Sequence, residues 1–553
     1  MRSLVPVLLA ALSLHAQGPR LAEVQERRLP NGVRLLLVER RDLAAFHAAM
    51  VLRGGRAEEP SALAGASDLV ARALFGQTRP EDLDAAKGPG SLDALLQEEE
   101  GILESLRQEG LRHRKDPASA SQAPALEAAL QNLRKTLKAR LSTAPLADLY
   151  AARGGRQTAS ASADALLVQT ELPAGAFEFW CRTEVQRLSV LQLSRFSEAR
   201  TALAAELRAQ GPQGMALLRG AALPGHPYGR DLADHLPALE AMRRSDLRTW
   251  ARQAFRPDRL ALVLVGGVGM ETALPLIERT FGTLPAVGGS EDPLLPEIPA
   301  DLGDRRIQAS LGGIPTLVVG WRIPARAHQD HLALRMAAQL LGAGPSGRLA
   351  QRLVRQKGLA QGAEIGLDVP GGRLPGLLVA SLTPTDGKTL AELEAALHTE
   401  ILRLQQEPIP ADEWQRALTQ VDVDQLRIQD EPGALARTLG LAWAEAGDWR
   451  QADLELQRLR NLGPETVQAA ARAWLKPSHR TTLWLQPGTE EGQDPLEIET
   501  ARVLKALAAS RIEDLAQREQ MVSEGLRQLR MLSLEERRRT LQLLTAQLPP
   551  EKR

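Results

Sequence analysis

The chain has 553 residues and no net charge, because 68 lysines and arginines balance 68 aspartates and glutamates. This balance provides no overall field to attract nucleic acid or an acidic membrane, so association with partners must depend on local surfaces. Hydrophobic residues make up 44% of the chain, enough for more than one core. The single cysteine, Cys181, excludes an internal disulfide and a cysteine-rich zinc module.

Residues 1–16 are typical of a signal peptide. They combine one positive charge at Arg2, a short apolar stretch and small residues that end at Ala16. The stretch is too short for a membrane anchor, and no later segment has the apolar length needed to span a bilayer. The sequence therefore predicts a bacterial protein that is exported to the periplasm or secreted after the signal peptide is removed.

A strand followed by a helix comes next. The stretch 51–60 begins as an apolar strand, passes a glycine pair and ends in a polar turn, and a helix is predicted over 66–75. This helix carries Asp68, Ala71 and Arg72. Asp68 and Arg72 are four residues apart with the acid first, the favourable order for a helix ion pair worth about 0.2–0.5 kcal/mol.

Residues 79–145 contain two series of leucines spaced by three and four residues, which places each series on one helical face. The leucines are Leu92, Leu96, Leu103 and Leu106, then Leu126, Leu130, Leu133, Leu137 and Leu141. With a loop over 112–123, the pattern predicts an antiparallel helical hairpin. Two roles remain open for it: a self-packed addition or a docking arm for a partner protein.

The chain then shows an internal repeat. Helix, proline-marked stop and apolar strand follow one another at 245–266 and again at 464–486. This indicates two homologous lobes, an N-terminal one at 17–284 and a C-terminal one at 304–487. A segment rich in proline, glycine and acidic residues, 285–303, is expected to link them. Beyond both repeats, 488–553 is predicted to form an amphipathic helical tail.

The order and spacing of several short motifs resemble the pitrilysin and insulinase family of zinc peptidases over about residues 26–487. The family signature is an inverted H-x-x-E-H motif on the helix after such a strand, with a conserved flank. The chain keeps the flank as Leu74, Phe75, Gly76 and Thr78. Further marks are His226-Pro-Tyr-Gly229, Gln308–Gly312, Ser346–Leu349 and Lys357–Ala360.

The resemblance implies an α+β fold of two homologous lobes, each a sheet backed by helices, in a clamshell arrangement around a peptide chamber. The helical hairpin at 79–145 and the helical tail are additions to that plan. The resemblance also implies zinc, which the family holds through two histidines and a later glutamate.

Carried over to this chain, the first histidine of the motif falls on Asp68, the glutamate base on Ala71 and the second histidine on Arg72. The third ligand of the family matches Glu206. An arginine stays protonated and has no free lone pair, and a catalytic zinc needs about three protein ligands. We therefore expect no catalytic residue, no metal and no other cofactor at these vestigial positions.

Two arrangements of the vestigial positions remain open. In one, Glu206 faces the helix, and Arg72 occupies the space of the zinc and supplies the positive charge that Glu206 requires. In the other, Asp68 and Arg72 form an exposed pair on a solvated helix face.

The second lobe is altered as well. Family members carry an arginine and a tyrosine in the pattern L-R-E-x-x-G-L-A-Y, and the matching positions here are Val354 and Gln361. The neighbouring Arg355 takes the place of the family's arginine if the match to the motif shifts by one residue. Arg355 and Gln361 are the candidate substrate contacts that the resemblance implies.

Three classes of function follow. The favoured one is a non-catalytic subunit that pairs with a separate zinc-bearing peptidase and helps to hold extended peptide in a shared chamber. The second is a stand-alone peptide-binding or scaffold protein. The third is an active zinc peptidase with a non-standard site, which Asp68, Ala71 and Arg72 disfavour.

Overall fold

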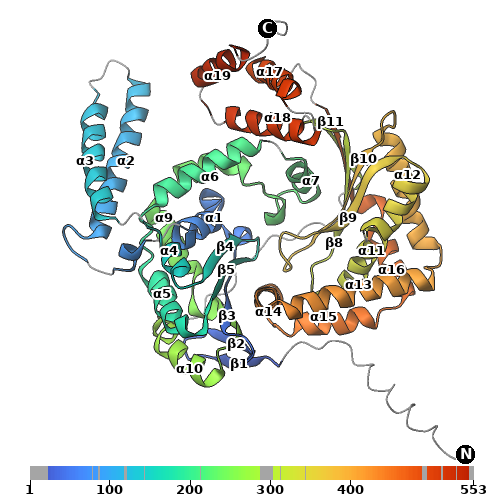
Figure 1. Cartoon of the computed structure of the whole chain (residues 1–553), viewed down its shortest axis with the longest axis horizontal. Helices are drawn as coiled ribbons and strands as arrows, with labels where there is room; N and C mark the ends of the chain where they lie inside the picture. The colour runs from blue at the N-terminus through green and yellow to red at the C-terminus, as the bar shows by residue number, and fades with distance from the viewer. Residues whose placement is uncertain are drawn as a thin grey trace, which may run out of the picture.

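The computed structural model of the chain (Figure 1) describes most of its length. The described residues are 23–76, 79–84, 87–116, 121–141, 144–211, 213–286, 303–311, 313–342, 344–487, 495–511, 515–530, 532 and 534–546. The expected signal peptide, Thr78, Gly312 and most of the expected linker lie outside these residues.

The N-terminal lobe, called lobe 1 from here on, is built on a six-stranded sheet with the order β1-β2-β6-β3-β5-β4. The strands are β1 (Gln25–Arg28), β2 (Arg34–Glu39), β3 (Ala45–Arg53), β4 (Arg156–Ala161), β5 (Ala165–Pro173) and β6 (Leu260–Gly266). Strand β6 pairs in parallel with β2 and antiparallel with β3. Every residue of β6 is buried, as its unbroken apolar sequence requires of a strand covered on both faces.

Helices cover one face of this sheet. They are α1 (Ala66–Val70), which continues as π-helical turns η3 (Ala71–Gly76), then α4 (Leu146–Ala151), α5 (Phe177–Val190), α6 (Phe196–Gln210), α8 (Leu236–Ala241), α9 (Arg244–Ala254) and α10 (Met270–Arg279). The core on this side includes Phe46, Trp180 and Phe281. Cys181 is fully buried there, as expected for a core residue. Helix α7 (Gly214–Ala222) follows α6 in the chain and packs on the sheet of the other lobe.

The C-terminal lobe, called lobe 2, likewise consists of a sheet with helices packed on it. Its sheet has five strands in the order β7-β11-β8-β10-β9. The strands are β7 (Arg305–Ser310), β8 (Thr316–Ile323), β9 (Ala360–Asp368), β10 (Gly376–Pro384) and β11 (Arg480–Gln486). The helices are α11 (His331–Gly342), the π-helical η11 (Ala350–Gln356), α12 (Leu390–Gln406), α13 (Ala411–Asp430), α14 (Pro432–Ala446), α15 (Gln451–Arg460) and α16 (Pro464–Trp474). In lobe 1 the last strand, β6, pairs in parallel with β2. In lobe 2 the last strand, β11, pairs in parallel with β7 in the same way, so the predicted repeat is confirmed.

Each lobe covers the second face of the other lobe's sheet with one of its own helices. Helix α14 of lobe 2 packs on β3, β5 and β6 of lobe 1, where Leu439 and Trp443 join the core around Val263. Helix α7 of lobe 1 packs on β8 and β11 of lobe 2, where Leu218 joins Leu483. Because two of the cores contain residues from both lobes, the lobes form one body.

A polar contact reinforces this packing. The turn between β9 and β10 reaches lobe 1, where Arg373 forms an ion pair with the buried Glu58 and its backbone N–H donates to Asp164 at 2.9 Å. The hydroxyl of Tyr228 also donates to Asp164, at 2.6 Å. Tyr228 lies in the His226-Pro-Tyr-Gly229 motif, so this motif serves the junction between the lobes.

The expected additions are present. Helices α2 (Leu92–Lys115) and α3 (Ala123–Arg140) form a hairpin that projects from lobe 1 (Figure 1). Helix α2 continues to Lys115, so the loop is shorter than the 112–123 expected from the sequence. The tail helices α17 (Pro495–Arg511), α18 (Leu515–Arg530) and α19 (Leu534–Ala546) pack together, and α18 lies against α6.

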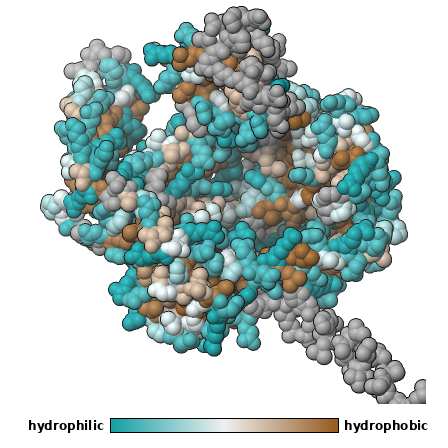
Figure 2. Space-filling model, in the orientation of Figure 1, coloured by the Kyte–Doolittle hydropathy of each residue, from teal (hydrophilic) through white to brown (hydrophobic). Residues whose placement is uncertain are grey.

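The space-filling view shows a recess between the two lobes, next to the tail, in which apolar side chains gather (Figure 2). In the part of the chain that the structure describes, no helix combines the length and apolar character that crossing a membrane requires.

The variant Gly440→Ala tests how tightly α14 packs on the sheet of lobe 1. A Cβ atom at Gly440 would lie 2.5 Å from Cγ2 of Val51, so we expect overpacking of about 1–3 kcal/mol, measured as a lower midpoint of urea unfolding. Gly433→Ala on the same helix is the control, because the nearest atom there is 3.5 Å away. Equal midpoints for the two variants would contradict the packing between the lobes.

Candidate functional site

The vestigial positions gather where α1 and η3 face α6. Nη2 of Arg72 donates to Oε2 of Glu206 at 2.5 Å. The side chains are 39% and 47% exposed, so the pair stabilises the fold by about 0–1 kcal/mol only. Glu206 therefore faces the helix of Arg72 as the first arrangement requires, but the pair is half-exposed rather than buried.

Asp68 has a different partner from the one its spacing suggested. Its carboxylate accepts from Nε and Nη2 of Arg56, at 2.7 and 2.5 Å, in a two-pronged ion pair. These hydrogen bonds raise the pKa of Arg56. Of the two arrangements left open by the sequence, the Asp68–Arg72 pair is therefore not the one that forms. Asp68 pairs with η1 (Arg56–Glu58), and Arg72 pairs with α6.

The residues at these positions do not fit zinc. A guanidinium holds the carboxylate of Glu206, another holds that of Asp68, and neither guanidinium has a lone pair for a metal. Ala71 is buried and offers no base. Among the described residues there is also no group of three or more histidines, cysteines, aspartates or glutamates that could hold a metal ion.

Glu59 is a site residue that the sequence reading missed. Its carboxylate is 5% exposed and accepts from the N–H groups of Gly65 and Ser67, at 2.7 and 2.6 Å. It thereby caps the amino end of α1, where a negative charge is favourable. Burial nevertheless raises its pKa to about 7. The sequence signal was weak, because Glu59 is simply the second of two glutamates before a proline.

Strand β4, at the edge of the sheet of lobe 1, runs beside η3, the π-helical turns that include Arg72. It pairs only with β5 among the described strands, so its other edge carries unpaired strand positions. Its residues alternate between exposed and half-buried, as in a strand with one open face.

The two candidate contacts of the second lobe lie on neighbouring elements. Arg355 is in η11 and Gln361 is the second residue of β9, and both are exposed. Strand β9 is the edge strand of its sheet, and at Gly362 and Gly366 there is open space where a Cβ would point. The structure leaves both side chains accessible, and their contact with a substrate stays a prediction.

Comparison with protein families matches residues 241–421 to the family model described as the Peptidase M16 inactive domain. An uncharacterized zinc protease of Mycobacterium leprae is 26% identical over 156 residues, which are 26% of this chain and 33% of that protein. The chain thus aligns with only about a third of the length of this relative.

Solved structures share the fold. A protease from Helicobacter pylori matches with a TM-score of 0.67 and 17% identity over 84% of this chain and 100% of that one. The periplasmic protease PqqL of Escherichia coli matches with a TM-score of 0.61 and 14% identity over 92% of this chain and 50% of that chain. At these identities the likeness concerns the fold, and it extends over both lobes.

The raised pKa of Glu59 predicts a pH dependence of stability. In the folded chain Glu59 keeps its proton up to about pH 7, whereas an unfolded glutamate releases it near 4.5. The stability contributed by this group is thus complete below pH 4.5 and is lost as the pH rises through 7. Over this range the unfolding free energy of the parent should fall by up to about 3 kcal/mol relative to Glu59→Gln.

Urea unfolding of both proteins across this range measures the difference. Any loss of the capping hydrogen bonds in Glu59→Gln is independent of pH, so only the slope is informative. A flat difference would contradict the raised pKa, because it would show that Glu59 has the same pKa in the folded and the unfolded chain.

The double variant Asp68→His, Arg72→His tests whether only the ligands are missing. Both positions lie on the helix that faces Glu206, so two imidazoles would complete a set of two histidines and one glutamate. Elemental analysis after dialysis should find about one zinc per variant chain and none in the parent. Adding Glu206→Gln should remove the zinc again, and stoichiometric zinc in the parent would refute our account of the site.

Proposed function

This chain is a relative of the M16 peptidases, the pitrilysin and insulinase family, and we propose that it is a non-catalytic subunit of a peptidase complex. It completes the peptide-binding chamber of a separate, zinc-bearing partner. The observation that carries the proposal is the ion pair between Arg72 and Glu206, two residues that the resemblance matches to metal ligands of the family. A guanidinium there keeps Glu206 charge-balanced without zinc, so the lobe folds as a peptidase lobe and leaves the chemistry to a partner.

The fixed position of the two lobes supports a partner. Helices α7 and α14 lock the lobes to each other. Lobes that share cores in this way resist opening against one another, so enclosing a peptide requires a second body that closes over this one.

Two sheet edges are suited to holding extended peptide. The open edge of lobe 1 belongs to β4, the strand that runs beside η3, and strand addition at such an edge gives sequence-tolerant binding through backbone hydrogen bonds. The edge strand β9 of lobe 2 offers open space at two glycines, beside the accessible side chains of Arg355 and Gln361. We assign peptide binding to these edges.

Export is part of the proposal. The signal-peptide pattern of residues 1–16 and the similarity to a protease described as periplasmic both support a location outside the cytoplasm. The partner should then be exported as well.

Two alternatives have different requirements. A stand-alone peptide-binding or scaffold protein uses the same open edges without a partner. An active zinc peptidase with a non-standard site needs ligands other than Asp68, Ala71 and Arg72. A neighbouring gene for an exported homologue with an intact H-x-x-E-H motif favours the complex, and its absence favours the stand-alone binder.

The direct test mixes the mature chain with the zinc-bearing homologue from the same genome. We expect an equimolar complex in analytical ultracentrifugation and cleavage of unstructured peptides that neither chain achieves alone. Replacing the motif glutamate of the homologue by glutamine should abolish cleavage while the complex persists, because the base comes from the partner.

The remaining outcomes separate the alternatives. Tight peptide binding by the isolated chain, with no complex and no gain in cleavage, supports the stand-alone binder. Cleavage by the isolated chain that is sensitive to chelators supports the active peptidase.

A further inference from the structure

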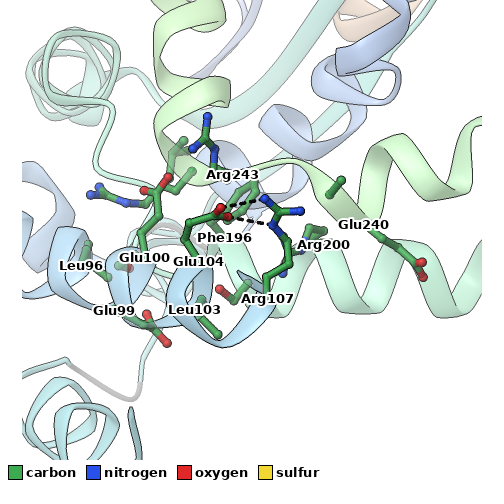
Figure 3. A pocket seen from close by; sticks show the side chains of 15 residues that line it. Leu96, Glu99, Glu100, Leu103, Glu104, Arg107, Phe196, Arg200, Glu240 and Arg243 are labelled. Carbon is green, nitrogen blue, oxygen red and sulfur yellow. Dashed lines mark hydrogen bonds and ion pairs between the residues drawn. The ribbon is translucent and has the colours of Figure 1, made fainter. Parts of the chain in front are cut away.

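A cavity of about 250 Å³ lies between α2 of the hairpin and helices α6, α8 and α9 of lobe 1 (Figure 3). The hairpin is fastened beside it by polar contacts. Asp93 accepts from Arg244 and Arg248, at 3.2 and 2.6 Å, and the carboxylate of Glu100 accepts from the N–H and hydroxyl of Ser245. The cavity exists only because the hairpin is inserted, so it is a property of this chain rather than of its peptidase-like body.

Most of the charged side chains that line the cavity are already neutralised. The ion pairs are Glu99 with Arg134, Glu104 with Arg107, Glu240 with Arg208, Arg243 with Asp246, and Arg244 with Asp93. Figure 3 shows the side chains of Glu104 and Arg107, three residues apart on α2, joined by hydrogen bonds. Hydrogen bonds from Arg107 and Gln108 lower the pKa of Glu104 to about 2. This carboxylate therefore stays ionised, and its oxygens accept from those two side chains.

Arg200 differs from these residues. Within the described part of the chain, no carboxylate lies within ion-pair distance of its guanidinium, which is half-buried on α6. Nη1 donates to the backbone carbonyl of Met242 at 2.6 Å, and the guanidinium carbon lies 5.4 Å from the centre of the Phe196 ring. Burial lowers the pKa of Arg200, and the nearby charge of Glu100 offsets this only in part. Since a guanidinium has five N–H groups, Arg200 keeps donors for a ligand.

Apolar side chains also line the cavity. Leu96, Leu103, Leu193 and Phe196 contribute to its walls. The volume is smaller than the roughly 300–1,000 Å³ of pockets for drug-sized molecules, but far larger than the roughly 30 Å³ that one water occupies. The space therefore suits an apolar group of about one amino-acid side chain, next to one unpaired cation.

We propose that this cavity binds an apolar carboxylate of single-residue size, with the carboxylate on Arg200 and the apolar body against Leu103 and Phe196. A free amino-acid derivative and the C-terminal residue of a longer peptide share this chemistry. Glu100 lies near enough to act on Arg200 through its charge, but its hydrogen bonds go to Ser245, and no hydrogen bond or ion pair joins it to Arg200 among the described residues.

The cavity is separate from the vestigial metal position. Arg200 and Glu206 lie on the same helix but six residues apart, roughly 240° around its axis, so they lie on different faces. The inference does not depend on the proposed function, since it uses only the hairpin, α6 and the segment around Met242.

The test is calorimetric titration of the full mature chain with N-acetyl-leucine and with its neutral counterpart, N-acetyl-leucinamide. Ligands of this size reach dissociation constants of millimolar order. We expect the carboxylate to bind at least tenfold more tightly than the amide. Arg200→Gln should weaken carboxylate binding by roughly ten- to a hundredfold, and Arg200→Lys, which restores the charge, should recover part of it.

Arg107→Gln is the matched control, because it removes a guanidinium of the same cavity that Glu104 already neutralises. This variant should bind N-acetyl-leucine as the parent does, and circular dichroism should show all variants folded. A longer peptide that ends in leucine distinguishes the two sources: comparable or tighter binding indicates a peptide C-terminus, and binding of the small ligand alone indicates a free carboxylate.

Three results would overturn the inference. They are no binding of N-acetyl-leucine by the parent at concentrations on the order of 10 mM, equal binding of acid and amide, and equal loss in Arg200→Gln and Arg107→Gln.

Discussion

The exchange of helices between the lobes is the constraint on which the rest of the molecule depends. Each sheet has one face covered by its own helices and the other by a single helix from the opposite lobe, α14 on lobe 1 and α7 on lobe 2. Neither sheet could leave that second apolar face in water, so neither lobe is complete alone. The contact of Arg373 with Glu58 and Asp164 fixes the same relative position with charge.

Within this rigid body, arginines pair with the carboxylates at the positions that match the family's metal motif. A zinc ion balances the negative charge of its carboxylate ligand, and here guanidinium groups do so, Arg72 on Glu206 and Arg56 on Asp68. Both pairs are partly open to solvent, so they add little stability, and their main effect is to occupy the carboxylates. The buried Glu59 at the start of α1 holds this helix in place from the other side.

The two additions both meet α6. The hairpin leaves a cavity with the unpaired Arg200 on one face of this helix, and α18 of the tail contacts the helix as well. Helix α6, which carries Glu206, thus contacts the tail and also lines the cavity beside the hairpin. This arrangement gives the additions a structural role in supporting lobe 1, whether or not they bind ligands.

The sequence by itself determined the repeat, the two lobes, the hairpin and the loss of the metal motif, because periodic apolar residues and short motifs are local signals. It also restricted Arg72 to two partners without choosing between them. Only the tertiary structure decided that Glu206 pairs with Arg72 and that Arg56 takes Asp68. Their partners come from segments 134 and 12 residues away, and such pairings depend on packing that leaves no periodic trace in sequence. The same holds for α7 and α14, whose amphipathic patterns predict helices but do not predict that each covers the sheet of the other lobe. It holds also for the cavity around Arg200, which is formed by segments far apart in the sequence.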